Sequence, residues 1–264
     1  MPGTVSNDRK GLGIFDFFSV FWRSLLLQAS WSFDRMQSLG FAFAIEPVLR
    51  KLYRDRTEYQ ERLKCHMEYF NTQPYFATFI LGAVMRQEED RATGKDRGRD
   101  VSGLKTALMA PLGALGDSFF WGALKPFAAI VAVAAGMLGS WWAPLLYLVL
   151  FNLWHVSLRI GLLIWGYRSG GDAVSLLAIY NFTKMARLFK IISLTVLGSI
   201  LGMMPFWRPE FRLEYPVSEV FIVVSCMALT FGLIGILRRG GSPIKLMLGL
   251  AIICLALAYA GVIR

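Results

Sequence analysis

Long apolar runs separated by short basic stretches fill the second half of the chain. A helix that crosses a bilayer needs about 20 predominantly apolar residues, and four runs approach or exceed that length: Pro144–Trp165, Leu188–Pro205, Val217–Leu237 and Ile244–Ile263. A shorter alanine-rich run, Phe127–Leu138, offers small side chains that allow close helix packing. The pattern predicts an all-α integral membrane protein with a C-terminal bundle of about four transmembrane helices.

The N-terminal part carries shorter and more polar patterns. Apolar side chains recur at helical spacing from Ile14 to Leu26 between charged residues, which predicts an amphipathic helix on the membrane surface or packed beneath other helices. A second apolar run, Leu39–Ile45, is too short to cross the bilayer and is expected to end at Pro47. The polar start, Met1–Lys10, predicts a cytoplasmic tail without a cleavable signal peptide.

Two charged segments organise the space between these runs. Arg50–Lys64 predicts a solvated helix, and a docking surface for a soluble partner is the alternative. Arg91–Lys105 is a polar connector that contains glycine, as loops between structural regions often do. We therefore expect an N-terminal amphipathic and re-entrant helical region over residues 1–105. Residues 106–264 would hold a broken-helix motif and the transmembrane bundle.

The broken-helix motif is expected between Met109 and Pro126. This stretch is apolar enough for membrane depth, yet one proline and three glycines interrupt it, and it carries Asp117 beside Ser118. Irregular backbone at membrane depth is tolerated where it lines a cavity or is buried in protein, and an ionisable residue there often marks a substrate path. The alternative is an interfacial loop in which Asp117 caps a helix and faces water.

A second polar group precedes the apolar run Tyr75–Met85. Pro74 disfavours helical geometry at the residue before it, so Asn71, Thr72 and Gln73 are expected to form a turn. This turn would cap a short re-entrant helix and place hydrogen-bonding side chains at its positive end. Ordinary capping by Asn71 or Thr72, with the nearby histidine solvated at an interface, explains the same residues.

Composition and charge agree with a membrane protein. The chain has 55% hydrophobic residues, a mean hydropathy of +0.49 and a net charge of +10. Basic residues beside apolar spans follow the positive-inside rule, so lipid rather than nucleic acid explains the charge. Their distribution places the N-terminus in the cytoplasm and the C-terminus outside, with Phe206–Pro216 as an outer loop. Three scattered cysteines and two isolated histidines predict neither a disulfide framework nor a metal site.

A third polar group lies within the predicted span Pro144–Trp165. Asn152, His155 and Arg159 are spaced to share one helix face, which must point into protein. Contacts that hold helices together are the favoured role, and sugar binding is the alternative.

Candidate chemistry concentrates in the polar turn and the broken-helix motif. We find no sequence motif of a hydrolase, a nucleotide-binding loop or a cofactor site, and His66 is the only histidine placed to accept a phosphoryl group. Sugar binding needs carboxylate and amide groups for hydroxyls and an aromatic ring for the apolar ring face. The chain offers these as Glu68, Asn71, Thr72, Gln73, Asp117, Ser118 and Trp121. Phe70 and Tyr69 are further candidates for the ring.

Three motifs resemble the IID membrane component of mannose-type phosphotransferase permeases. They are Arg23–Trp31 followed by Asp34–Gln37 and Gly40, the segment His66–Pro74, and Leu112–Ser118 with Lys125. The family's usual His-x-Glu-Phe-Phe-Asn-Thr-His-Pro has Gln73 here in place of its second histidine, and glutamine cannot titrate.

The resemblance implies a subunit of the mannose/fructose/sorbose family in the bacterial cytoplasmic membrane. It implies an obligate IIC membrane partner in a hetero-oligomer, and phosphorylated IIA and IIB components that pass a phosphoryl group to a hexose or amino-hexose. Since the family's phosphohistidines lie on those components, no catalytic residue, phosphorylated residue or cofactor is expected on this chain. The departure at Gln73 keeps a second possibility open, a family-derived membrane scaffold or regulator without transport activity.

Overall fold

The computed structural model describes residues 11–95, 100–173, 182–207 and 219–259. Most of these residues are helical, and no strand longer than an isolated bridge occurs within them. The predicted all-α fold is therefore confirmed. The chain forms two compact units, Met1–Leu197 and Gly198–Arg264. The predicted tail Met1–Lys10 and the outer loop, apart from its first two residues, lie outside the described residues.

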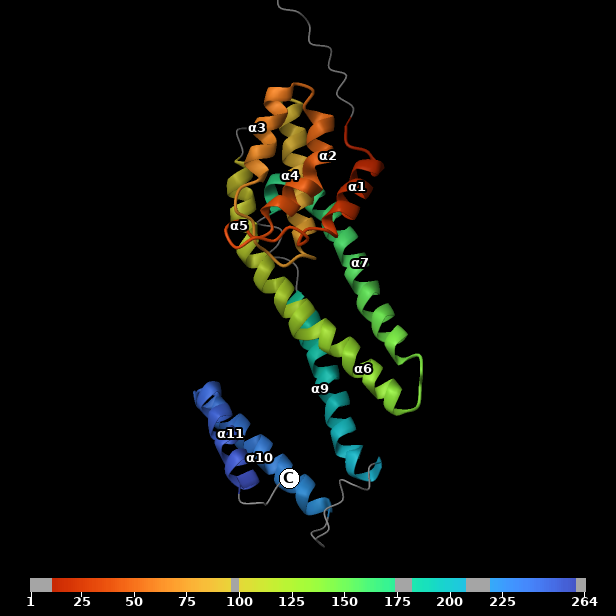
Figure 1. The fold of residues 1–264 in the computed structure, drawn as a ribbon, viewed down its shortest axis with the longest axis vertical. Helices are drawn as coiled ribbons and strands as arrows, with labels where there is room; N and C mark the ends of the chain where they lie inside the picture. Colours follow the sequence, from red (N-terminus) through yellow and green to blue (C-terminus); the bar gives the residue numbers. More distant parts are fainter. Residues whose placement is uncertain (1–10, 96–99, 174–181, 208–218, 260–264) are drawn as a thin grey trace, which may run out of the picture. The chain divides into compact units, whose positions relative to one another are not determined.

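Four helices make up the N-terminal part of the first unit (Figure 1). Their bounds are α1 Ile14–Ser24, α2 Ser38–Leu52, α3 Arg56–His66 and α4 Ala77–Ala92. The expected end of the second helix at Pro47 was wrong, because α2 continues through it to Leu52. Proline has no N–H to offer the carbonyl four residues earlier. Here the carbonyl of Phe43 accepts a hydrogen bond from Arg23 Nη1 at 3.1 Å instead, which compensates for the missing donor.

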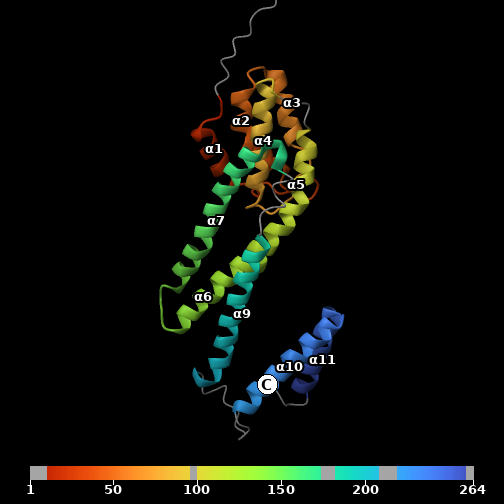
Figure 2. The ribbon, with the colours of Figure 1, turned by 180° about the vertical axis from the view of Figure 1, so that it is seen from behind.

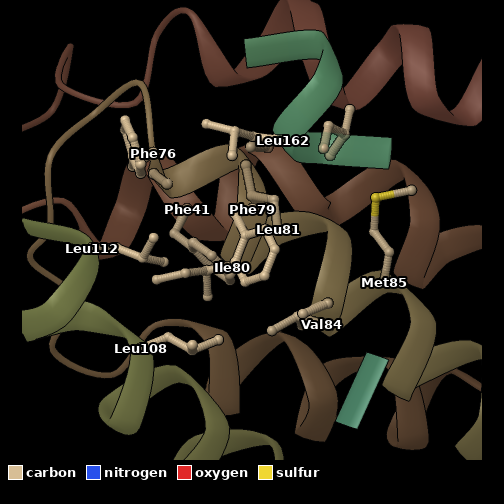
Figure 3. Close-up of a cluster of buried hydrophobic side chains, with 14 of the residues drawn as sticks. Phe41, Phe76, Phe79, Ile80, Leu81, Val84, Met85, Leu108, Leu112 and Leu162 are labelled. Atoms are coloured by element: carbon tan, nitrogen blue, oxygen red, sulfur yellow. The ribbon is translucent and has the colours of Figure 1, made fainter. Parts of the chain in front are cut away.

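Helix α4 is the centre of the core. It packs against α2, α5 and α7, as the front and rear views show (Figures 1 and 2). Its buried side chains, among them Phe79, Ile80 and Val84, meet Phe41 of α2 and Leu108 of α5 (Figure 3). Full burial of one such side chain contributes roughly 2 kcal/mol, so this contact holds the N-terminal helices as one body.

A long helix follows the core and contains an irregular section. It comprises α5 Val101–Gly116, the π-helical segment η1 Asp117–Leu124 and α6 Lys125–Met137. The broken helix predicted here was therefore wrong: the chain stays helical and absorbs the irregularity as i→i+5 turns. Such π-helical runs occur frequently at functional sites. The predicted division after Lys105 falls inside α5.

The remaining helices are apolar. They are α7 Ala143–Ser169, the short 3-10 turn η2 Gly170–Asp172, α9 Phe182–Trp207, α10 Glu219–Arg238 and α11 Pro243–Tyr259. Among the described residues, two helices are long and apolar enough to cross a membrane, Val101–Met137 and Ala143–Asp172. Shorter apolar stretches occur in α10 and α11. The count of about four transmembrane helices stays a prediction.

Candidate functional site

A pocket lies between the polar turn, helix α5 and the start of the π-helical segment. Its volume is about 590 Å³. Five of the seven predicted site residues line it: Asn71, Thr72, Gln73, Asp117 and Trp121. Residues more than 40 positions apart in the sequence thus meet in one cavity.

Two predicted residues do not line this pocket. Glu68 accepts a hydrogen bond from the Ser102 hydroxyl at the start of α5, and Ser118 is exposed. Conversely, Gln28, Gln37 and Thr106 line the pocket but were not predicted as site residues. Both glutamines belong to the motifs that carried the resemblance, so that signal was available for them.

Gln37 fixes the polar turn from the start of α2. Its Nε2 donates to the carbonyl of Thr72 at 2.8 Å, and its Oε1 accepts from the Thr72 N–H at 3.2 Å. The Thr72 hydroxyl in turn donates to the carbonyl of Met109 in α5 at 2.9 Å. Because both ends of the Gln37 side chain are used, the turn is held against α2 and α5 with one backbone geometry.

Gln73 closes the turn that leads into α4. Its Oε1 accepts from the N–H groups of Tyr75 at 2.8 Å and Phe76 at 3.0 Å. The predicted turn is therefore present ahead of α4, and its side-chain hydrogen bonds come from Gln73, while the N-cap residue Phe76 makes no side-chain capping bond. Gly116 of α5 makes room for this side chain, since a Cβ there would lie only 2.6 Å from the Gln73 Cβ. Glycine at this position lets the two segments approach closely.

The π-helical segment contributes a carboxylate and an aromatic ring. Asp117 is exposed at its first position, and no partner for its carboxylate occurs within the described ranges. Trp121 is 44% exposed, and the ammonium of Lys125 lies 4.9 Å from its ring centroid. Phe120 of the same segment anchors it by packing on Tyr75, with ring centroids 4.4 Å apart. Acceptor and ring thus face the cavity from one helical turn.

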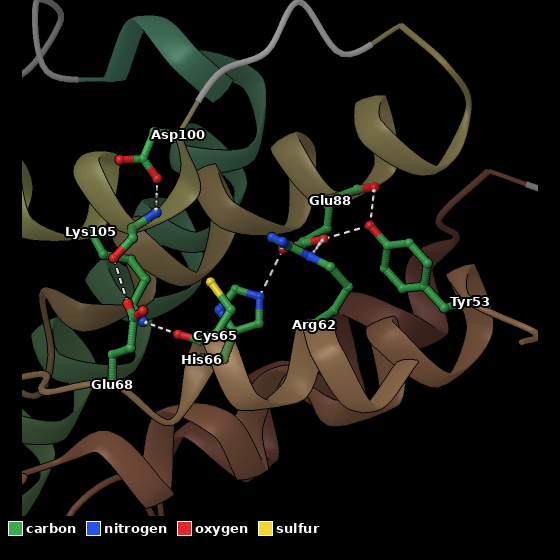
Figure 4. Close-up of polar contacts among 9 residues, drawn as sticks. Tyr53, Arg62, Cys65, His66, Glu68, Glu88, Asp100 and Lys105 are labelled. Atoms are coloured by element: carbon green, nitrogen blue, oxygen red, sulfur yellow. Dashed lines mark hydrogen bonds and ion pairs between the residues drawn. The ribbon is translucent and has the colours of Figure 1, made fainter. Parts of the chain in front are cut away.

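A separate polar cluster lies inside the N-terminal helices (Figure 4). Glu88 of α4 accepts hydrogen bonds from Tyr53, from Arg62 through two nitrogens, and from His66 at 2.8 Å. Burial alone would raise the pKa of Glu88, but these three donors outweigh it and lower the pKa to about 2. Burial lowers the pKa of His66, so the imidazole is neutral and donates through Nε2.

The burial of His66 decides two earlier possibilities. Its side chain is 0% exposed, so the expectation of a solvated histidine at an interface was wrong. A histidine that accepts a phosphoryl group must be reachable by the donor. His66 is therefore a structural partner of Glu88 in this fold.

The polar face predicted on α7 is only partly buried. Arg159 is buried and donates to the carbonyl of Pro74 at 3.0 Å and to the Ser24 hydroxyl at 3.3 Å. It thereby holds α7 to α1 and to the polar turn, which confirms the predicted role in helix packing. Asn152 is exposed in the single chain and donates to the carbonyl of Leu148, so it does not share the buried position of Arg159, and its contact with protein stays a prediction.

Known proteins resemble this chain over most of its length. The family model for the mannose/fructose/sorbose family IID component of the phosphotransferase system matches residues 12–263. The mannose-specific EIID component of Escherichia coli K12 is 38% identical over 202 residues, 75% of this chain and 71% of the relative. The fructose permease IID component of Bacillus subtilis is 29% identical over 262 residues, 93% and 95% of the two chains.

A solved structure shows the same fold in a transporter. A chain of the mannose transporter ManYZ in complex with microcin E492 superposes with a TM-score of 0.58 at 31% identity. The match covers 96% of this chain and 98% of that one. A second solved membrane protein gives a TM-score of 0.69 at 31% identity over the same shares. The chain therefore belongs to the mannose/fructose/sorbose family of IID components, the membrane subunits of phosphotransferase sugar-transport systems.

Proposed function

We propose that this chain forms, together with a IIC membrane subunit, the sugar path of a mannose-type permease in the bacterial cytoplasmic membrane. Sugar that leaves the path on the cytoplasmic side receives a phosphoryl group from phosphorylated IIA and IIB components. The observation that carries this proposal is the pocket that gathers Asn71, Thr72, Gln73, Asp117 and Trp121. The relatives of this chain include mannose, fructose and sorbose components, which supports a hexose or amino-hexose as the substrate.

The chemistry of the pocket suits a pyranose. A volume of about 590 Å³ exceeds the space of a single hexose, which leaves room for groups from a partner subunit. The Asp117 carboxylate and the Asn71 amide can bind hydroxyls, while the exposed face of Trp121 can cover the apolar side of the sugar ring. For Glu68 and Ser118, which lie outside the lining, a direct sugar contact stays a prediction.

An obligate IIC partner is supported by the apolar surface of the chain. An apolar groove of about 540 Å³ between α6 and α7 is lined by small residues such as Ala132 and Gly136. Large apolar side chains are exposed nearby, including Leu138 at 78%. Lipid or another helix must cover such a surface. This chain is similar to a chain of the mannose transporter ManYZ, and a IIC subunit is the partner we propose for this surface.

Replacement of pocket residues tests the site. We expect Asp117→Asn and Asn71→Ala each to lower sugar uptake about 10-fold, because the first weakens a charge-assisted hydrogen bond to the substrate and the second removes a hydrogen bond. Uptake would be measured in cells that express the complete permease. Co-purification with IIC should be unchanged for both variants. Asn152→Ala, an exposed asparagine on α7, is the matched control and should transport normally. If both pocket variants also transport normally, the proposed pocket is wrong.

Reconstitution tests the function itself. The complex of this chain with IIC, IIA and IIB is supplied with mannose, glucose, N-acetylglucosamine and N-acetylgalactosamine in vesicles, and uptake and phosphorylation are measured. We expect at least one sugar to enter and to be phosphorylated. Loss of activity on all four sugars would favour the scaffold without transport activity. Transport by this chain in the absence of IIC would refute the obligate partnership.

A further inference from the structure

The carboxamide of Gln73 has an orientation that its neighbours dictate. Two backbone N–H groups, those of Tyr75 and Phe76, point at one end of it. Only the oxygen can accept from them, because the opposite orientation would place the amide nitrogen against two donors. The nitrogen must therefore occupy the other end. Gly116 packs against the Cβ and Cγ atoms and keeps the side chain in this place.

The nitrogen end of Gln73 lacks a partner. The side chain is 2% exposed, and its Nε2 has no hydrogen-bond partner among the residues that the structure describes. A buried donor without a partner is energetically unfavourable, because its desolvation is not compensated. Gln73 belongs to the lining of the pocket, where a ligand can supply the missing acceptor.

The polar groups around Gln73 differ in whether they can donate a hydrogen bond to a ligand or accept one from it. The Gln37 amide and the Thr72 hydroxyl already have intrachain partners, so they offer little to a ligand. Asp117 is an acceptor when ionised and cannot donate. Gln73 therefore contributes a donor of fixed direction, and Asp117 contributes an acceptor. A ligand that fits must present an acceptor to the first and a hydroxyl or N–H to the second.

We propose that Gln73 is a specificity-determining residue and that its Nε2–H donates to an oxygen of a neutral sugar. A ring hydroxyl or the carbonyl of an acetamido group supplies such an oxygen. This inference rests on the proposed function, since it names the ligand atom that the same pocket selects. A group that only donates, such as an ammonium, leaves the Gln73 donor unsatisfied and is rejected at this position.

The Gln73→Glu variant inverts the polarity without removing the hydrogen bonds that close the turn. One carboxylate oxygen still accepts from the two backbone N–H groups, while the other replaces the Nε2 donor that has no partner within the described residues. Binding of mannose, glucose, N-acetylglucosamine and N-acetylgalactosamine to the purified complex with IIC is measured by calorimetry. We expect affinity for the bound sugar to fall about 30-fold or more at pH 7.5. It should recover as the pH is lowered, because a protonated carboxyl donates again.

Gln60→Glu is the matched control. Gln60 is exposed on α3 and does not line the pocket, so this variant adds the same negative charge to the chain without altering the site. We expect it to bind sugar within about threefold of the unaltered complex, since a solvated charge is largely screened. Equal losses in Gln60→Glu and Gln73→Glu would show that charge alone weakens binding and would overturn the inference.

Sugar analogues give a test whose first result, on the unaltered complex, does not depend on a variant that folds. Each hydroxyl of the bound sugar is replaced in turn by hydrogen and by fluorine, which keeps a weak acceptor but no donor. At one position the deoxyfluoro sugar should bind the unaltered complex more tightly than the deoxy sugar, and Gln73→Glu should abolish that difference. Absence of such a position in mannose or glucose, which carry no acetamido group, overturns the inference even when the sugar binds. If none of the four sugars binds, the proposed function fails, and this inference fails with it.

Discussion

At the scale of single residues, Glu88 shows how the N-terminal helices are joined. Its carboxylate is 0% exposed and accepts from side chains of Tyr53, Arg62 and His66. These residues come from the end of α2 and from α3, so one buried acceptor on α4 connects three helices. A buried charge of this kind is tolerated because all of its main lone-pair directions are satisfied.

Removal of the Glu88 charge should destabilise the fold. Glu88→Gln leaves the Arg62 guanidinium without its counter-charge in a largely buried site, which typically costs about 3 kcal/mol or more. We expect a lower melting temperature of the detergent-solubilised complex. Glu61→Gln, an exposed carboxylate on the neighbouring helix α3, is the control and should melt like the unaltered complex. Equal melting of the Glu88 variant would mean that the cluster contributes little to stability.

The same cluster predicts a pH dependence of stability. Both Glu88 and His66 have a lower pKa in the folded state than in the unfolded chain. The unfolded chain therefore binds more protons in acid, and folding becomes less favourable as the pH falls. The loss should begin below the ordinary histidine value of 6.5 and grow between the ordinary glutamate value of 4.5 and about 2. Thermal melts across this range should show a smaller slope in Glu88→Gln.

Many residues of the candidate site could be predicted from the sequence, but the hydrogen bonds that connect them could not. Amides beside a proline and a carboxylate among glycines are unusual in apolar sequence, so Asn71, Gln73 and Asp117 were identifiable. The hydrogen bonds of Gln37 were not identifiable, because they join residues 35 positions apart and form only when α2 lies beside the turn. The hydrogen bonds of Gln73 to the turn likewise depend on the position in which Gly116 holds its side chain.

At the scale of helices, α4 and α7 cross at unusually short range. A Cβ at Gly166 would overlap the carbonyl of Phe79, and a Cβ at Gly82 would overlap the carbonyl of Leu163. Paired glycines let helix backbones touch, which increases van der Waals contact where lipid offers no hydrophobic gain. This crossing positions α7, and with it Arg159, against the start of α4.

Exchange of one glycine on α7 should separate these helices. Gly166→Ala must push α7 away from α4, and we expect a loss of about 3 kcal/mol, as for other overpacked sites. Gly161→Ala on the same helix is the control, because its Cβ would meet no atom within 4 Å. Melting of the solubilised complex should distinguish them. If Gly166→Ala is as stable as Gly161→Ala, the close crossing does not hold the fold.

The positions of the helices were predicted better than the irregular sections within them. Apolar spacing predicted the helices, because burial of one face follows directly from the sequence. The behaviour of prolines and glycines inside helices depends on tertiary partners. Arg23 compensates for Pro47, and packing of Phe119 and Phe120 keeps the segment after Asp117 helical. Neither partner is visible in the local sequence.

At the scale of the whole molecule, the uneven distribution of basic residues among the turns predicts a membrane topology that can be tested. Basic residues at Arg238, Arg239 and Lys245 surround the turn between α10 and α11, which we expect on the cytoplasmic side. The turn between α6 and α7 carries no charge and should face outward. With this orientation, we expect part of the overall charge of +10 to contact anionic lipid on the cytoplasmic side.

Cysteine labelling in cells tests this orientation. After replacement of the native cysteines, Ser140→Cys between α6 and α7 should react with a membrane-impermeant maleimide in intact cells. Ser242→Cys between α10 and α11 should react only after permeabilisation. Uptake of sugar by both variants is the control for assembly. The opposite labelling pattern would reverse the predicted topology.

The π-helical run also sets the rotational phase of the helix that follows it. Each residue of an α-helix turns the chain by about 100°, and an i→i+5 turn accommodates one additional residue without breaking the helix. Shortening Asp117–Leu124 by one residue would keep the helix continuous but rotate α6 about its own axis, carrying Ala132 and Gly136 away from α7. Deletion of a single residue in this segment would therefore change the direction in which α6 presents its side chains, while the polar turn stays in place.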